Sequence, residues 1–335
     1  MAGREFLDAL CPKSDYVFFD DDCVYLNWAL MSPGLRGSTA GEDYARYRAA
    51  GPALFDRLGS LHAAVRRQAG EFFGYPDDCV FLTGNATSAL ETLQDLFKRQ
   101  FASGWFLATD RSYASLVLAL DGEFRNCTRW CEPTTRSFID AVRTLDDPTM
   151  VVLEGQEYRA GSRYDIVRIA VAVAERRTAG VPLFLLVDAS QWPAPDWGFG
   201  EFVSYVVSGA NWAGGASGCA FGLAAPLLEL ESRHAGWGSL NGQWTYPIHR
   251  NFKETASRLD ACGGGKPWLP LSTCARGWSM RRVSGGRGSK STSSAWLTAH
   301  ASNSSQPAFP SFPSRTRVET SPSRFRRLRG RANTC

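Results

Sequence analysis

Short apolar runs alternate with longer polar segments along most of this chain. The runs lie at Val80–Thr83, Trp105–Ala108, Thr149–Leu153, Val181–Val187 and Phe202–Ser208. A strand that is apolar on both sides is buried on both sides, as the strands of parallel sheets are. The alternation therefore predicts an α/β fold, in which helices cover both faces of a mostly parallel sheet.

The segments between the runs have the apolar spacing of helices. We expect helices over 41–73, over Ala86–Phe101, from Tyr113 onward and over Asp165–Thr178. In sheets of this kind, ligands bind just beyond the carboxyl ends of the strands. The residues that directly follow each run are therefore the first candidates for a functional site.

The net charge of +4 hides two regions of opposite sign. Residues 276–335 have a net charge of +11, and residues 1–275 have a net charge of −7. An acidic body argues against a nucleic-acid partner. The sequence has no apolar run of about 18 residues, which argues against a membrane span. The nine cysteines show no paired framework and no metal-ligand spacing. We therefore expect a cytoplasmic protein without a metal.

Pattern and composition divide the chain into four parts. These are an N-terminal segment (1–40), a large domain (41–245), the start of a smaller domain (246–273) and a basic tail (274–335). The tail is rich in serine and arginine and lacks apolar periodicity, which is typical of disorder. A change of reading frame near Thr273 is the alternative, because another frame over Gly277–Arg282 can encode a good helix sequence.

The first motif is the segment Phe81–Thr87, where a strand, a glycine turn and a helix start follow one another. Free backbone N–H groups at the start of a helix can bind a phosphate, and Thr87 would add a hydroxyl. The alternative is an ordinary helix N-cap, where Asn and Thr are favoured in any case.

Two further motifs follow the last two apolar runs. In Leu185–Gln191, Asp188 comes directly after a buried strand and can pair with a cationic ring nitrogen. A solvated aspartate at a strand end is the alternative. In Val206–Gly218, a strand meets a glycine-rich turn, which lets the backbone approach a ligand closely. A flexible loop is the alternative there.

The order and spacing of the three motifs resemble the class V aminotransferase-fold enzymes that use pyridoxal 5'-phosphate (PLP). Cysteine desulfurases, isopenicillin N epimerase-like proteins and kynureninases belong to this group. The resemblance spans about residues 20–272 and includes Tyr25–Asn27, Tyr158–Gly161 and Ala235–Gly238. It implies a PLP fold type I large domain, a small C-terminal domain, a homodimer and an amino-acid-like small molecule as substrate. Because the basic tail does not look like the end of such a small domain, we expect that domain to be incomplete or aberrant.

The resemblance also assigns roles to single residues. Those expected at the phosphate are Asn85, Ala86, Thr87 and Ser208. Tyr113 would stack on the pyridine ring, although it could instead be a core tyrosine. Asp188 would pair with the ring nitrogen, and Gln191 would bond the phenolic oxygen. Arg258 would bind a substrate carboxylate, unless it is an ordinary surface arginine.

The main departure from the family pattern is Asn211, which stands where the family has its Schiff-base lysine. An amide can neither condense with an aldehyde nor act as a base, so normal turnover should fall by several orders of magnitude. No lysine lies between Lys98 and Lys253, so no small shift of the alignment supplies one. Lys266 could reach a phosphate across a dimer but is a poor replacement.

Three hypotheses about function follow. The chain is a degenerate class V protein that binds PLP non-covalently or has lost it. Alternatively, it is a repurposed amino-acid lyase or epimerase of secondary metabolism. The third hypothesis is a non-enzymatic dimerising partner or a truncated gene product.

Overall fold

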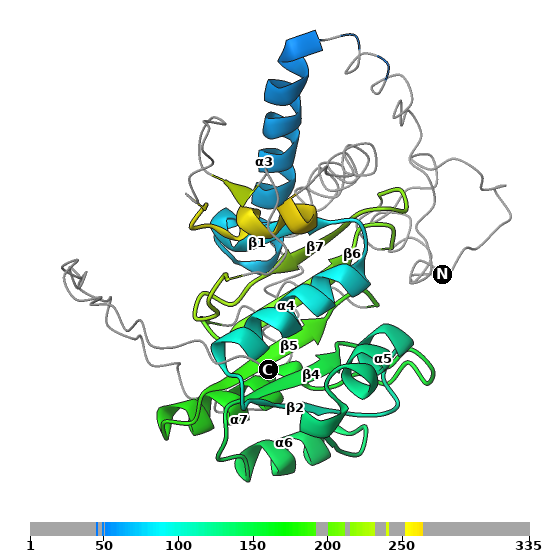
Figure 1. Cartoon of the computed structure of the whole chain (residues 1–335). Helices are drawn as coiled ribbons and strands as arrows, with labels where there is room; N and C mark the ends of the chain where they lie inside the picture. The colour runs from blue at the N-terminus through cyan, green and yellow to red at the C-terminus, as the bar shows by residue number, and fades with distance from the viewer. Residues whose placement is uncertain are drawn as a thin grey trace, which may run out of the picture. The chain divides into compact units, whose positions relative to one another are not determined.

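The computed structural model describes residues 45, 49, 51–191, 200–211, 215–231, 239–240 and 252–263, all within one compact unit. They form a seven-stranded sheet in the order β1-β7-β6-β5-β4-β2-β3 (Figure 1). The strands are β1 (Val80–Thr83), β2 (Trp105–Ala108), β3 (Thr128–Trp130), β4 (Thr149–Glu154), β5 (Leu183–Asp188), β6 (Val203–Ser208) and β7 (Ala220–Leu223). Only β7 pairs antiparallel with its neighbours. The prediction of a mostly parallel α/β fold is confirmed.

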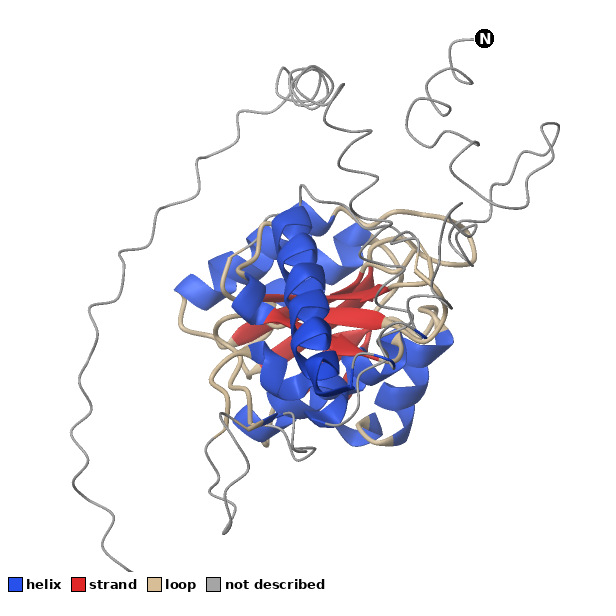
Figure 2. Ribbon diagram, turned by 90° about the horizontal axis from the view of Figure 1, so that it is seen from above, coloured by secondary structure: helices blue, strands red, loops and turns tan. Residues whose placement is uncertain are grey.

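Helices cover both faces of this sheet (Figure 2). One face packs against α3 (Leu54–Phe73), α6 (Thr135–Arg143) and α7 (Ile166–Thr178). The other packs against α4 (Ala86–Gln100) and α5 (Ala114–Gly122). Short 3-10 turns lie at η2 (Gly51–Ala53), η3 (Asp77–Cys79), η4 (Arg125–Cys127) and η7 (Ala256–Gly263), the last against β1.

The continuous apolar runs are explained by burial on both faces. In β5, Leu183, Leu185 and Val187 point into the core beneath α7, while Phe184 and Leu186 point into the core beneath α4. All five are at most 2% exposed. Fully burying a side chain of this size stabilises the fold by about 1.5–3 kcal/mol, so neither face of the strand tolerates a polar residue.

Strand β7 lies between β1 and β6 and pairs antiparallel with both, so β1 runs in the same direction as the parallel strands. Its Gly222 lies against the Phe81 ring, and a Cβ at this position would come within 2.2 Å of a ring carbon. A larger residue would push β1 and β7 apart. Because β1 runs the same way as β2 to β6, the carboxyl ends of these strands lie at one edge, which we call the carboxyl edge.

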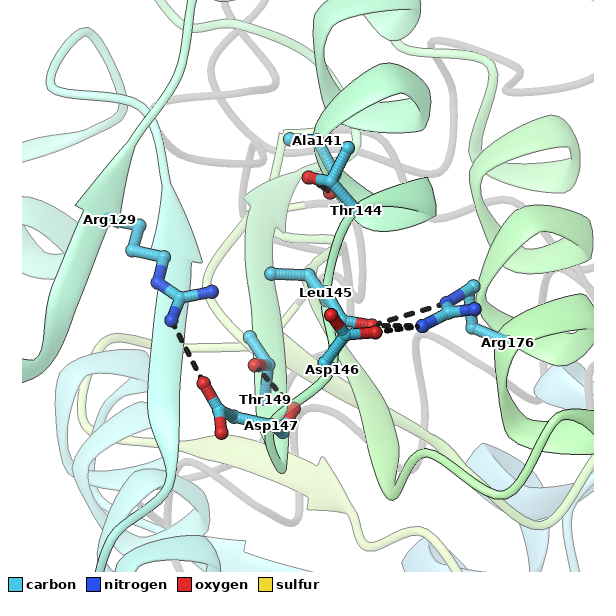
Figure 3. A network of polar contacts seen from close by, with 8 residues as sticks. All are labelled: Arg129, Ala141, Thr144, Leu145, Asp146, Asp147, Thr149 and Arg176. Atoms are coloured by element: carbon cyan, nitrogen blue, oxygen red, sulfur yellow. Dashed lines mark hydrogen bonds and ion pairs between the residues drawn. The ribbon is translucent and has the colours of Figure 1, made fainter.

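The opposite, amino edge of the sheet is held by surface ion pairs (Figure 3). The loop between α6 and β4 carries Asp146 and Asp147. Arg129 of β3 lies 3.1 Å from the Asp147 carboxylate, and Arg176 of α7 lies 2.7 Å from that of Asp146. Arg176 also donates to the carbonyl oxygen of Leu145. These contacts join the loop to both neighbouring elements.

The structure differs from the sequence prediction in some elements. The helix expected over 41–73 is interrupted at η2, where Gly51 has a φ of 56° and Pro52 has no N–H to donate. The sequence analysis did not predict β3, α6 or β7. Of the expected small-domain segment, the structure describes only 252–263, and the tail and residues 1–40 lie outside the described residues. No helix in the described ranges is both long and apolar enough to cross a membrane.

Candidate functional site

The start of α4 forms one side of the carboxyl edge. Asn85 caps the helix, because its Oδ1 accepts a hydrogen bond from the Ser88 N–H at 2.8 Å. The N-cap interpretation of this side chain is thus confirmed. The next two N–H groups, of Ala86 and Thr87, have no acceptor inside the helix. A Cβ built on Gly84 would meet nothing within 4 Å. The backbone there is open to a ligand and suited to an anion.

The start of α5 lies next to the start of α4. The Thr87 hydroxyl donates to Ser115 Oγ at 2.9 Å, which ties the two helices together at their first turns. Tyr113 is the N-cap of α5, and its side chain is 44% exposed. Its ring contacts Tyr158 edge to face, with the centroids 5.4 Å apart. The alternative that Tyr113 is a core tyrosine is therefore wrong, because the ring is partly exposed.

A continuous hydrogen-bond network joins Asp188, Ser190, Ser208 and Asn211 at the ends of β5 and β6. The Ser190 N–H donates to Asp188 Oδ1 at 2.9 Å, and the Ser208 N–H donates to Ser190 Oγ at 3.0 Å. The Ser208 hydroxyl donates to Asn211 Oδ1 at 3.0 Å, and Asn211 Nδ2 donates to the Ser190 carbonyl oxygen at 3.4 Å. The two sequence motifs around Asp188 and Asn211 therefore meet in one site.

Asp188 is a buried carboxyl group, 6% exposed. Burial raises its pKa, and the hydrogen bonds from Ser190 act in the opposite direction. The alternative of a solvated aspartate at a strand end is therefore wrong. No arginine or lysine of the described residues forms an ion pair with Asp188. The site thus presents an acidic group that a cationic ligand would stabilise in its charged form.

Glu154, at the end of β4, is a second buried carboxyl group that the sequence analysis did not identify. It lies opposite Asp188 in the register of β4 and β5 and is 1% exposed. Its Oε2 accepts a hydrogen bond from the Tyr113 N–H at 3.3 Å. Burial raises the pKa of Glu154 to about 8, and the nearby Asp188 contributes to this rise. The sequence signal that could have identified Glu154 is an acidic residue directly after an apolar run.

The described contacts say less about Gln191 and Arg258, the last two residues with predicted roles. Gln191 is half-buried and follows the Asp188–Ser190 turn directly. Arg258 lies in η7, against β1, with its guanidinium carbon 4.3 Å from the centroid of the Phe252 ring. Its carbonyl oxygen accepts a hydrogen bond from the Ser239 hydroxyl at 2.7 Å, and no contact among the described residues joins Arg258 to Asp188. Its role as a carboxylate-binding residue stays a prediction.

Taken together, the carboxyl edge brings Thr87, Tyr113, Asp188, Ser208 and Asn211 to the ends of β1, β2, β5 and β6. This edge offers an anion-binding helix start, an exposed aromatic ring and a buried acid. Within the described ranges, no group of three His, Cys, Asp or Glu side chains is arranged to hold a metal ion. The helix start would suit an anionic group, and the buried acid would suit a cationic one.

Comparison with solved structures gives extensive matches to PLP enzymes. A variant of the protein C-DES, in which a lysine is replaced by alanine and glycine is covalently linked to the PLP cofactor, matches with a TM-score of 0.67 and 17% identity over 79% of this chain and 72% of that chain. The cystine C–S lyase C-DES in complex with its reaction product, cysteine persulfide, has a TM-score of 0.65 and 17% identity over 78% of this chain and 72% of that one.

The apo cysteine desulfurase of Thermococcus onnurineus has a TM-score of 0.63 and 15% identity, and the match covers 84% of this chain and 72% of that one. No model of a known protein family matches the chain, and no curated protein matches its sequence. At these identities the likeness establishes the fold. The chain has the mixed α/β architecture, with a mostly parallel seven-stranded sheet, of the PLP fold type I proteins.

Proposed function

We propose that this chain binds PLP non-covalently at the carboxyl edge, and that it lacks normal Schiff-base catalysis because Asn211 stands at the lysine position. The observation that carries the proposal is the network that joins the buried Asp188 to Asn211. It connects the predicted partner of the ring nitrogen with the predicted lysine position. The substrate class would be an amino-acid-like small molecule.

The residues present fit PLP in charge and polarity. The N–H groups of Ala86 and Thr87 would bind the phosphate at the positive end of α4. Tyr113 would stack on the ring, Asp188 would pair with the ring nitrogen, and Gln191 would bond the phenolic oxygen. When bound, PLP supplies an electron sink for reactions at the carbon next to an amino group.

Asn211 and Ser208 are joined by a hydrogen bond at the end of β6. The Ser208 hydroxyl donates to the Asn211 amide oxygen, and the Asn211 amide nitrogen donates to a backbone carbonyl oxygen. Asn211 is only 9% exposed, and these hydrogen bonds fix the orientation of its amide inside the site. It would orient a bound ligand but would form no covalent bond to it. A phosphate contact from Ser208 would require its hydroxyl to turn away from Asn211.

One structural neighbour holds PLP in a protein of this fold after a lysine has been replaced by alanine. This supports non-covalent retention of PLP here. The names of the neighbours, a cystine C–S lyase and a cysteine desulfurase, favour a sulfur-containing amino acid among the ligands to be tried first. Kynureninase-like chemistry, a homodimer and a cytoplasmic location stay predictions.

The test is a titration of the purified full chain with PLP, followed by absorbance and then by borohydride reduction and dialysis. We expect saturable binding that dialysis reverses both before and after reduction. Asp188→Asn is the matched variant, because it keeps the size of the side chain and removes the charge. Absence of saturable binding would refute the proposal, and so would PLP that borohydride fixes to a lysine.

A further inference from the structure

Glu154 and Asp188 lie side by side in the interior of the carboxyl edge. They face each other in the register of two adjacent parallel strands, β4 and β5. Glu154 is 1% exposed and Asp188 is 6% exposed. Two carboxylates this close and this buried repel each other, so ionising both is costly. Interacting groups of this kind titrate as a pair and not independently.

The hydrogen bonds of Glu154 leave one of its oxygens unpaired. Oε2 accepts from the Tyr113 N–H, whereas Oε1 is buried and has no hydrogen-bond partner among the described residues. Glu157, three residues later, is a useful contrast. Both of its oxygens accept backbone hydrogen bonds, from the N–H groups of Arg159 and Ala160. Both carboxyl oxygens of Glu157 therefore have backbone partners, whereas Glu154 Oε1 has none among the described residues.

The charges around Glu154 also disfavour its ionised form. Asp188 and Glu157 both raise the pKa of Glu154, and burial contributes more than either to the value of about 8. The N–H groups of Tyr113 and Tyr158 act in the opposite direction. Glu154 also interacts electrostatically with Tyr164, and Arg111 supplies a positive charge near Tyr164. No arginine or lysine of the described residues forms an ion pair with Glu154.

We propose that Glu154 and Asp188 form one proton-sharing pair, and that Glu154 releases its proton to solvent when a ligand with a cationic ring nitrogen binds at Asp188. Glu154 would act here as a positioning residue that sets the charge of the pair and holds the start of α5 through the Tyr113 N–H. The inference rests on the proposed function, since PLP is the cationic ligand considered. No bond to the ligand forms or breaks in this step.

The physical reason is electrostatic. Without a bound cation, the shared proton leaves a single negative charge in a region of low polarity. A cation at Asp188 stabilises both carboxylates and lowers the pKa of Glu154. At neutral pH, the carboxyl group that was protonated then loses its proton. The affinity for the cation should therefore rise with pH more steeply than it would with Asp188 alone.

The first experiment examines the chain without ligand. Infrared difference spectra over a pH titration should show a protonated carboxyl group that persists at pH 7 and disappears near pH 8. Glu154→Gln should remove the part of this band that titrates near pH 8. Glu157→Gln is the matched control, which should keep the band and lower its midpoint. A spectrum without a protonated carboxyl group at neutral pH would overturn the shared proton.

The second experiment counts protons on binding. PLP is titrated into the full chain at pH 7 by calorimetry in buffers of different ionisation enthalpy, for wild type and for both variants. Proton uptake by the ring itself cancels in the comparison. Wild type and Glu157→Gln should release up to about one proton more per chain than Glu154→Gln. If Glu154→Gln does not fold, the release by wild type should still disappear well above pH 8.

The outcomes separate this inference from the proposed function. PLP that binds wild type and Glu154→Gln with equal proton counts would overturn the pair and leave PLP binding intact. PLP that does not bind wild type at any pH would refute the proposed function together with the coupling. A protonated carboxyl band at neutral pH, removed by Glu154→Gln, would then show that Glu154 holds a proton but that PLP is not the ligand.

Discussion

The acidic residues at the two edges of the sheet lie in opposite environments. At the amino edge, Asp146 and Asp147 are exposed, and each pairs with an arginine (Figure 3). At the carboxyl edge, Glu154 and Asp188 are buried, and no described arginine or lysine forms an ion pair with them. Acidic residues occur on both edges, so the difference lies in their environment.

This contrast indicates which edge serves stability and which serves binding. Exposed ion pairs cost little to form and contribute little. Buried carboxyl groups without a cationic partner destabilise a fold, and groups with strongly shifted pKa values cluster at functional sites. A ligand that brings a positive charge would offset the cost at the carboxyl edge. We therefore expect mutations at the two edges to have different kinds of effect.

The largest expected effect is on ligand binding at the carboxyl edge. Asp188→Asn removes the predicted partner of the ring nitrogen, and losing one side of a buried charge pair costs about 2–5 kcal/mol. The Kd for PLP should therefore rise at least about 30-fold, measured by equilibrium titration. Asp147→Asn, at the amino edge, is the control and should leave the Kd unchanged. Equal affinities of wild type and Asp188→Asn for PLP would mean that Asp188 does not take part in binding.

An intermediate effect is expected on the pH dependence of stability. In the folded chain the pKa of Glu154 is raised to about 8 from 4.5, so between these values the folded state binds more protons than the unfolded state. The contribution of Glu154 to stability therefore falls as pH rises through this range, by at most about 1.4 kcal/mol per pH unit.

Denaturant unfolding of Glu154→Gln should therefore show a shallower loss of stability between neutral and mildly alkaline pH than wild type does. The free energy of unfolding of the variant should rise relative to that of wild type as the pH approaches 8. Parallel curves for the two proteins would mean that Glu154 is ionised in the folded chain at neutral pH, contrary to our account.

The smallest effect is expected at the amino edge. Asp147→Asn breaks the ion pair with Arg129, in which the aspartate and arginine side chains are 55% and 37% exposed. Its unfolding free energy should fall by less than about 1 kcal/mol, and added salt should reduce the difference. A double-mutant cycle with Arg129→Gln would isolate the pair. A coupling well above this value would show that the amino edge is more than a surface contact.

Much of the fold could be predicted because its signals are local. Trp105–Ala108 forms a strand with the predicted bounds, and the strand and helix around Gly84 agree to within one residue. The continuous apolar runs required burial on both faces, which only a covered sheet provides. In contrast, β3 has only three residues, and β7 is defined by its contact with β1, which is distant in the sequence.

The site was predicted only in part because its details depend on neighbours across strands. The positions of Asp188 and Asn211 followed from strand ends and glycine turns. That the Ser208 hydroxyl is bonded to Asn211 could not be read from the sequence. The importance of Glu154 arises from its register with Asp188, and pairing between strands is not visible in a sequence pattern.

The most direct test of the account is the mass of the Asn211→Lys variant after incubation with PLP and borohydride, measured beside wild type. If residue 211 faces the bound cofactor, the variant should gain the mass of one reduced PLP on the introduced lysine, as peptide mapping would show, and wild type should gain none. A variant that stays unmodified while it still binds PLP would contradict the placement of residue 211 in the cofactor site.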